Sequence, residues 1–126
     1  MKKKKSKQQV YVMQYAALKV EVAGIEALKD EDLRGRQQER AEANKRTMDK
    51  IERAIESLED PLHRTVMRAR YIDVETSELP TWETVALIMF RSEEQSKVKA
   101  AQRLHGRALQ AIAPIIARIE KEKSPS

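Results

Sequence analysis

Residues 80–107 decide the fold, and they read PTWETVALIMFRSEEQSKVKAAQRLHGR. Thr81 follows Pro80 and precedes an early acid and an apolar stripe, which is the order of signals that starts a helix. Ser92 and Gln95 have the spacing of a capping box, in which each side chain satisfies the other's exposed backbone amide. The sequence therefore predicts two consecutive helices separated by a short turn.

The second of these helices has two different faces on a wheel of ~3.6 residues per turn. The apolar face consists of Val98, Ala101, Leu104, His105, Ala108, Leu109 and Ile112. The other face carries amides, a hydroxyl group and cations but no acid: Gln95, Ser96, Lys99, Gln102, Arg103 and Arg107. Side chains of these kinds hydrogen-bond base edges and phosphates, so this face is predicted to bind double-stranded DNA. The alternative is the ordinary solvated face of a surface helix.

The segment before residue 80 contains its own helix signals. Met48, Ile51, Ile55 and Leu58 recur every three or four residues, which is typical of a helix that packs along one narrow seam. Asp60-Pro61 then predicts a new helix start, because aspartate caps free backbone amides and proline suits the first helical position. We expect this short helix to reach about residue 72, with a loop over residues 73–80. Its apolar members are Leu62, Val66, Met67, Ala69 and Tyr71.

The two ends of the chain give weaker signals. Residues 9–28 are dense in apolar side chains, which predicts a helix buried on more than one side. Residues 30–46 are almost wholly polar around Gly35 and are expected to form a solvated helix or a linker. Pro114 predicts a kink or break. The apolar cluster of Ile115, Ile116 and Ile119 is expected either to join the core or to form an oligomer contact.

The composition favours helices and excludes several classes of protein. Of 126 residues, 36% are charged and 4% aromatic, with three glycines and four prolines, a balance typical of all-α proteins. The absence of cysteine excludes a disulfide framework, thiolate metal sites and thiol nucleophiles. No apolar run approaches the roughly 20 residues that span a bilayer, and no apolar signal core follows the first lysines. We therefore expect a soluble, cytoplasmic protein that has no contact with membranes.

The positive charge is concentrated at the start of the chain. The net charge is +5, and the first seven residues contain five lysines and no acid, so residues 8–126 sum to zero. Residues 1–8 are predicted to be a disordered basic tail. It is either a simple solvated terminus or an arm that adds sequence-independent attraction to phosphates.

Signals for enzyme chemistry are missing. His63 and His105 lie on separate predicted helices without further ligands at metal-binding spacing. His105 falls on the inner face and is expected to be a hydrogen bonder at the edge of the core, whereas His63 is expected to face solvent. There is no glycine-rich phosphate loop and no carboxylate pair in an apolar setting. We expect no enzymatic activity, no metal and no cofactor.

The order of residues in the second half resembles a known family, the phage late-gene transcriptional regulators of the ArpU and RinA type, whose C-terminal part is similar to region four of sigma factors. The resemblance covers about half the chain, and it is carried by Ile51, Leu58, Asp60-Pro61, Arg64, Val66-Met67, Arg70-Tyr71-Ile72, Trp82-Glu83, Val85-Ala86 and residues 103–109 (RLHGRAL).

The resemblance implies a role for each matching residue. It makes Trp82, Val85 and Ala86 part of a supporting helix, and Lys99, Gln102 and Arg103 the groove-facing positions, with Arg107 on a phosphate. The chain departs from the family by about one extra helical turn between Ala86 and Leu104. The recognition helix is therefore expected to start either at Ser92, with Glu93 and Glu94 in its first turn, or near Ser96.

These observations combine into one predicted organisation. We expect an all-α helical bundle with an N-terminal helical arm over residues 9–47, which extends the core or drives oligomerisation. A helix-turn-helix domain similar to sigma region four follows over residues 48–113, and residues 114–126 form a C-terminal helix and tail. The expected function is sequence-specific regulation of transcription in a phage-infected bacterium, through a homodimer or higher oligomer. The alternatives are a small terminase subunit and a module that binds RNA polymerase without reading DNA.

Overall fold

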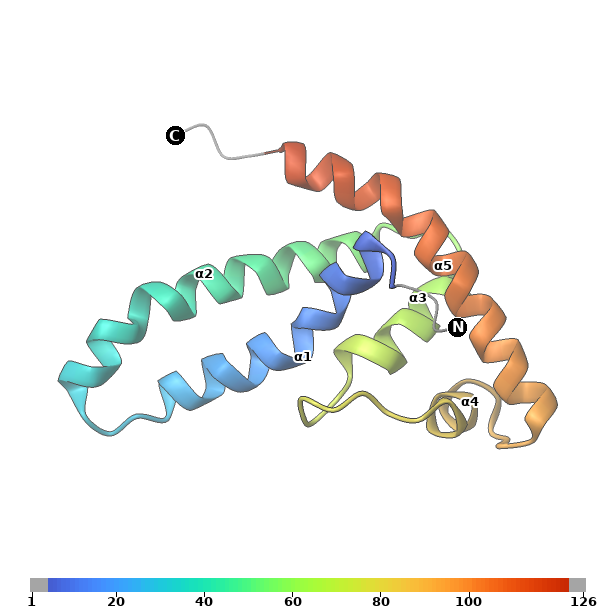
Figure 1. Ribbon diagram of the computed structural model, residues 1–126, viewed down its shortest axis with the longest axis horizontal. Helices are drawn as coiled ribbons and strands as arrows, with labels where there is room; N and C mark the ends of the chain where they lie inside the picture. Colours follow the sequence, from blue (N-terminus) through green and yellow to red (C-terminus); the bar gives the residue numbers. More distant parts are fainter. Residues whose placement is uncertain (1–4, 123–126) are drawn as a thin grey trace.

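The chain is helical over most of the range that the structure describes. The computed structural model describes residues 5–122, and its elements are α1 (Lys7–Glu26), α2 (Glu31–Glu56), α3 (Pro61–Met67), a π-helical turn (Arg68–Ile72), α4 (Trp82–Phe90) and α5 (Gln95–Lys121) (Figure 1). Residues 5–122 contain no strand, so the predicted all-α class is confirmed. The first four lysine-rich positions of the predicted basic tail lie outside the described residues, and Lys7 and Gln8 belong to α1.

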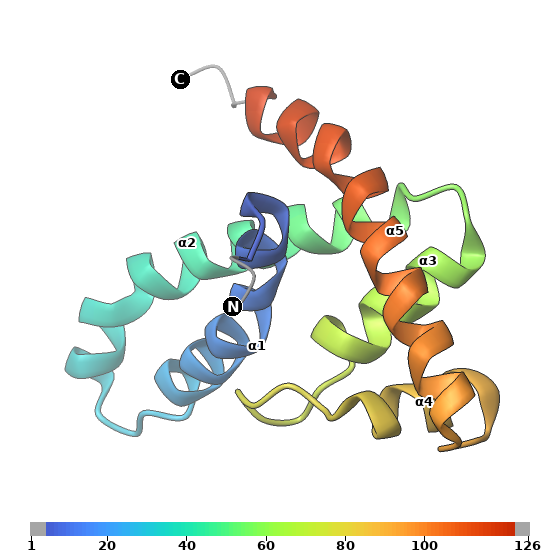
Figure 2. The same cartoon turned by 45° about the vertical axis from the view of Figure 1, so that its right-hand side comes forward.

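Two long helical elements set the shape of the molecule. α1 and α2 run antiparallel as a hairpin that extends to one side, and α5 lies along the other edge (Figures 1 and 2). α5 contacts every other α-helix, and its contacts with α3 and α4 are the most extensive. This helix is therefore the element that organises the bundle.

The predicted helix starts at Asp60 and Thr81 are confirmed. The Asp60 carboxylate accepts a hydrogen bond from the Leu62 amide at 2.8 Å, and Pro61 occupies the first helical position. The Thr81 hydroxyl oxygen accepts from the Thr84 amide at 3.2 Å. Each cap satisfies a donor that the first turn of a helix leaves free, which fixes the starts of α3 and α4 in the chain.

One central core joins both halves of the chain. Its fully buried members include Val12 from α1, Ile51 and Ile55 from α2, and Val85 from α4. Burying such side chains contributes roughly 1.5–3 kcal/mol each. The start of α1 therefore extends the core, as one of the two predictions for the N-terminal segment stated.

The α1–α2 hairpin differs from its prediction in two ways. α1 is not buried on several sides, because Val10 and Val20 are 56% and 47% exposed while its inward stripe packs on α2 and the core. α2 begins at Glu31 and continues without a break through Gly35, so residues 30–46 are a solvated helix and not a linker. Ion pairs between Arg40 and Glu21, at 3.1 Å, and between Lys45 and Glu26, at 2.6 Å, join the two helices.

The helix after Pro61 also departs from the regular form. Its last five residues form a π-helical turn, in which the Asp73 amide bonds the Arg68 carbonyl at 2.8 Å. Single π-helical turns of this kind widen the helix and are frequent at functional sites. Leu62, an apolar residue in the first turn of α3, is 50% exposed.

Pro114 does not break the last helix. α5 continues through it to Lys121, with a change of direction in its second half (Figure 1). Ile116 and Ile119 are buried in the central core and Ile115 packs against it, which decides between the two predictions for this cluster in favour of the core. The domain boundary expected before Pro114 therefore falls inside one continuous helix.

Candidate nucleic-acid interface

The six predicted DNA-binding residues lie together on the outward side of α5. We call this group the polar face: Gln95, Ser96, Lys99, Gln102, Arg103 and Arg107. All six are exposed. Within the part of the chain that the structure describes, none of them forms a hydrogen bond or ion pair with another side chain. Their donors and charges are therefore free for a partner that approaches α5 from outside.

α4 supports α5 from the inner side. Val85 and Ala86 of α4 are fully buried, as are Ala101 and Ala108 of α5. Small side chains at the contact allow two helices to pack closely. Val98 and Ile112 are also buried, so they continue the inward side of α5 and leave the polar face exposed on the opposite side.

Trp82 joins the two helices through a cluster with Arg70, Tyr71 and His105, which we call the Trp82 cluster. The His105 and Trp82 rings pack in an edge-to-face arrangement with centroids 4.9 Å apart, and the Arg70 guanidinium lies over the Trp82 ring, 4.5 Å from its centroid. Arg70 also donates a hydrogen bond to the Pro80 carbonyl, just before α4. The cluster therefore fixes α4 and α5 relative to the π-helical turn.

His105 is held in its neutral form inside this cluster. Burial, and secondarily the positive charge of Arg70, lower the pKa of His105 to about 4. Its Nε2 forms a hydrogen bond with the Tyr71 hydroxyl at 2.5 Å, and the Gln9 amide donates to the same hydroxyl oxygen at 3.4 Å. Burial in turn raises the pKa of Tyr71. The predicted hydrogen bonder at the edge of the core is confirmed and is a structural group.

The predicted capping box at Ser92 is wrong. α5 begins at Gln95 with Glu94 at its N-cap, and no side chain among the described residues caps it. Arg91 adopts a left-handed backbone conformation (φ 58°) that ends α4, and the Ser92 hydroxyl accepts from the Glu94 amide at 3.2 Å instead. Glu93 and Glu94 therefore precede the helix and do not lie in its first turn. Of the two predicted starts, the one near Ser96 is the closer.

Two residues beside the polar face were not predicted from the sequence. Gln110 lies two helical turns beyond Arg103 on the same side of α5 and is exposed. Lys5 lines a groove with Gly106, Leu109 and Gln110, because the start of α1 lies against the middle of α5. The periodicity of α5 could have identified Gln110. Nothing in the sequence indicated that Lys5 lies there, because that contact depends on how α1 packs.

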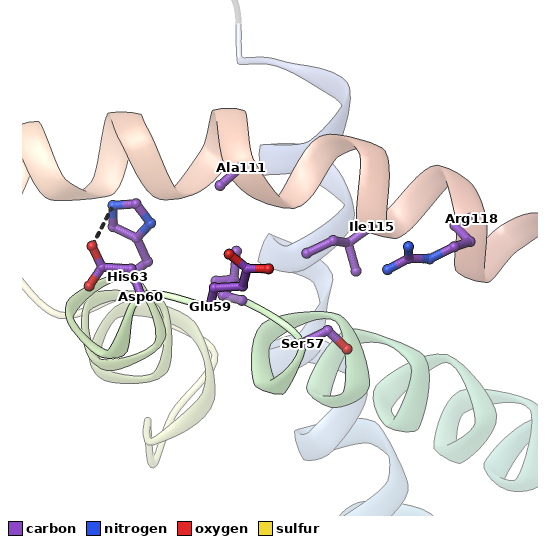
Figure 3. A pocket seen from close by; sticks show the side chains of 8 residues that line it. Ser57, Glu59, Asp60, His63, Ala111, Ile115 and Arg118 are labelled. Carbon is purple, nitrogen blue, oxygen red and sulfur yellow. Dashed lines mark ion pairs between the residues drawn. The ribbon is translucent and has the colours of Figure 1, made fainter.

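Another hollow lies between the α2–α3 connection and α5 (Figure 3). His63 points into it and its side chain is only 16% exposed, which corrects the prediction that it faces solvent. Its Nε2 lies 3.7 Å from an Asp60 carboxylate oxygen, and Glu59 and Arg118 line the same hollow. Two carboxylates make it unfavourable for a phosphate, so the polar face is the better candidate for a nucleic-acid interface.

Two further classes of site are not found in residues 5–122. No group of three or more histidine, aspartate or glutamate side chains is placed to hold a metal ion. No helix in this range is both long and apolar enough to cross a membrane.

Comparison with family models, with curated proteins and with solved structures finds no match to this chain.

Proposed function

We propose that this protein is a sequence-specific double-stranded DNA-binding regulator of transcription, which reads the major groove with residues 95–107 of α5. The observation that carries the proposal is the polar face, where three cations, two amides and a hydroxyl group stand exposed and, within residues 5–122, unpaired, without an acid among them. A B-DNA major groove is about 12 Å wide and admits one α-helix. A helix supported only from its inner side can enter such a groove without rearranging the bundle.

The positions along α5 suggest separate roles. Lys99, Gln102 and Arg103 lie in the first half of the helix, where a groove-inserted helix meets base edges. Arginine pairs with guanine and glutamine with adenine through two hydrogen bonds each, and lysine can replace arginine on guanine. Arg107 lies one turn further and is assigned to a phosphate. Gln95 and Ser96 complete the contact at the start of the helix.

The assignment to phage late-gene regulators of the ArpU and RinA type rests on the residue pattern of the second half. The fold is compatible with it, because Arg70, Tyr71 and Trp82, three of the residues that carry the resemblance, meet in one cluster behind α5. A small terminase subunit would use the same kind of face for DNA packaging. Native mass measurement separates the two, since a ring of many copies favours packaging.

The binding test begins with selection of bound sequences from random duplex DNA, followed by affinity measurements over a salt series. Replacing Lys99 and Arg103 by alanine should weaken binding of the selected duplex, because both residues are assigned to base edges. Replacing Arg107 by alanine should lower the steepness of log K against log salt by about 0.9, because Arg107 is assigned to one phosphate. If Arg103 reads a base, its loss should also reduce the preference for the selected site by about 10- to 100-fold. Unchanged affinity and slope would remove the polar face from DNA binding.

Arg36 supplies the matched control for that experiment. It is an exposed arginine on α2, with no hydrogen bond or ion pair to another described side chain. Replacing Arg36 by alanine removes the same charge from the hairpin, far from α5 in sequence. The control should leave both the affinity and the salt slope close to those of the parent protein.

One observation favours a protein partner as a second candidate function. Leu87 and Ile88 on the outer side of α4 are 43% and 52% exposed. Beside them, a groove lined by Asp73, Glu75 and Glu78 runs along the loop before α4. An RNA-polymerase-binding module would use such a surface. Retention of host RNA polymerase after nuclease treatment, together with no affinity for selected duplexes, would favour this function over DNA reading.

A further inference from the structure

α1 has a second apolar face, on the side turned away from the core. Its residues recur at alternating intervals of three and four, which is the spacing of a helix that pairs with another helix along a narrow seam. Val10 and Val20 are 56% and 47% exposed, and Met13 is half-buried at the edge of the core. We call this set the outer stripe: Val10, Met13, Ala17, Val20, Gly24 and Ala27.

The outer stripe is separate from the face that α1 uses inside the molecule. Tyr15, Val22 and Ile25 are buried and lie on the opposite side of the helix. Every member of the outer stripe except Met13 is exposed. At Gly24 the surface is open, because an added Cβ atom would meet no atom within 4 Å. Residues 5–122 of one copy therefore leave this apolar face uncovered.

The charged side chains in the middle of α1 do not interrupt the stripe. Glu21 and Glu26 form ion pairs with α2, at 3.1 Å and 2.6 Å. Lys19 donates a hydrogen bond to a carbonyl of the loop before α4, at 3.3 Å. The stripe covers seventeen residue steps, or about 25 Å of helix. A second helix laid along it would meet only uncharged side chains over this length.

The two halves of the segment that carries the stripe have opposite charge. Residues 5–18 contain two lysines and no acid, whereas residues 20–33 contain five acids and one lysine. Two copies that pair antiparallel place the positive half of each α1 beside the negative half of the other. A parallel pair would place like charges together, which is unfavourable. The segment is therefore complementary to a second copy of itself in the antiparallel orientation.

We propose that the outer stripe pairs antiparallel with the same stripe of a second copy of this chain, which forms a symmetric dimer. Such a dimer uses one surface twice, related by a two-fold axis. An axis between Ala17 and Val20 sets each larger side chain against a smaller one: Val10 against Ala27, Met13 against Gly24, and Val20 against Ala17. Alternation of large and small side chains allows two helices to interdigitate closely.

The dimer does not depend on the proposed function. The polar face belongs to α5 and takes no part in the pairing of α1. A protein that dimerises through the outer stripe but binds no duplex would remove the proposed function and leave this inference in place. Duplex binding by a protein that stays monomeric would do the reverse.

Sedimentation velocity over roughly 1 µM to 1 mM protein tests the dimer, because this range covers interfaces of modest affinity. Ala17→Glu should raise the dissociation constant about 100-fold or more, because each dimer then holds two new carboxylates close together at its centre. Ala43→Glu is the matched control, since Ala43 is an exposed alanine inside α2 and lies outside the stripe. Circular dichroism should show the parent's helicity in both variants. A monomeric parent at every concentration, or equal association of the two variants, would overturn the proposal.

Disulfide formation tests the orientation, because the chain has no native cysteine. A mixture of Val10→Cys and Ala27→Cys proteins should form the mixed disulfide, because the antiparallel pair sets these positions opposite each other. Val10→Cys alone should form few dimers, since its two copies lie about 25 Å apart along the pair. Preferential linkage of Val10→Cys to itself would indicate a parallel pair. That result, or no linkage at a concentration where the parent dimerises, would overturn the proposal even if Ala17→Glu failed to fold.

Discussion

Acidification should destabilise this protein through His105, and His105→Gln should remove most of that effect. His105 is only 8% exposed, and its pKa in the folded state is about 4, against about 6.5 in the unfolded chain. Between these values the unfolded chain binds a proton that the folded protein does not. The free energy of unfolding therefore rises with pH across this window. The contribution of His105 is lost as the pH falls from about 6.5 to about 4.

The size of the loss follows from the two pKa values. Each unit of difference between the two pKa values corresponds to ~1.36 kcal/mol of free energy of unfolding. The full pKa difference therefore corresponds to a loss of about 3 kcal/mol, reached near pH 4. By pH 5 about 2 kcal/mol is lost relative to pH 7. For a chain of this length that loss lowers the melting temperature by roughly 8 °C.

Urea denaturation at pH 7, 6 and 5 measures this loss directly. In His105→Gln the side-chain amide can still form a hydrogen bond with Tyr71 but cannot be protonated, so the difference between parent and variant isolates the titration of the histidine. The variant should lose about 2 kcal/mol less than the parent between pH 7 and pH 5. Parallel losses in the two proteins would refute the reasoning and would mean that His105 titrates as an exposed histidine does.

Three further changes have expected outcomes. Trp82→Ala should lower the free energy of unfolding by about 2–3 kcal/mol in chemical denaturation, because it removes a partly buried aromatic ring from the cluster behind α5; a loss below about 0.5 kcal/mol would contradict the packing role. Asp60→Ala should cost about 1 kcal/mol by removing the cap of α3, whereas Asp60→Asn should restore most of it. Gly106→Ala and Gly35→Ala should each raise the free energy of unfolding by roughly 0.5–1 kcal/mol, because both glycines lie inside helices and an added Cβ would meet nothing within 4 Å.

Local signals predicted the later helices well because their physical causes are local. A cap at Thr81 or at Asp60 depends on hydrogen bonds within two or three residues, which the sequence alone specifies. The inward face of α5 follows from a repeat of about 3.6 residues. For the same reason the residues of the exposed polar face could be identified from their spacing in the sequence.

The start of α5 was predicted wrongly because two local solutions competed. Ser92 and Gln95 fit a capping box, yet the left-handed conformation of Arg91 turns the chain so that the Ser92 hydroxyl bonds the Glu94 amide instead. Such a choice depends on where α4 must end to pack against α5. Non-glycine residues in this region of conformational space are uncommon, and side-chain chemistry alone does not indicate them.

The sequence by itself determined the helical class, the capped starts of α3 and α4, and which side of α5 faces outward, because hydrogen bonds and periodicity between near neighbours set all three. Only the tertiary structure decided the rest. It showed the π-helical turn, the contacts of Arg70 and His105 with Trp82, and the position of Lys5 beside Gly106. The contacts at Trp82 and at Lys5 join segments that are separated in the chain, so they depend on the packing of whole helices and leave no pattern within any one stretch of sequence.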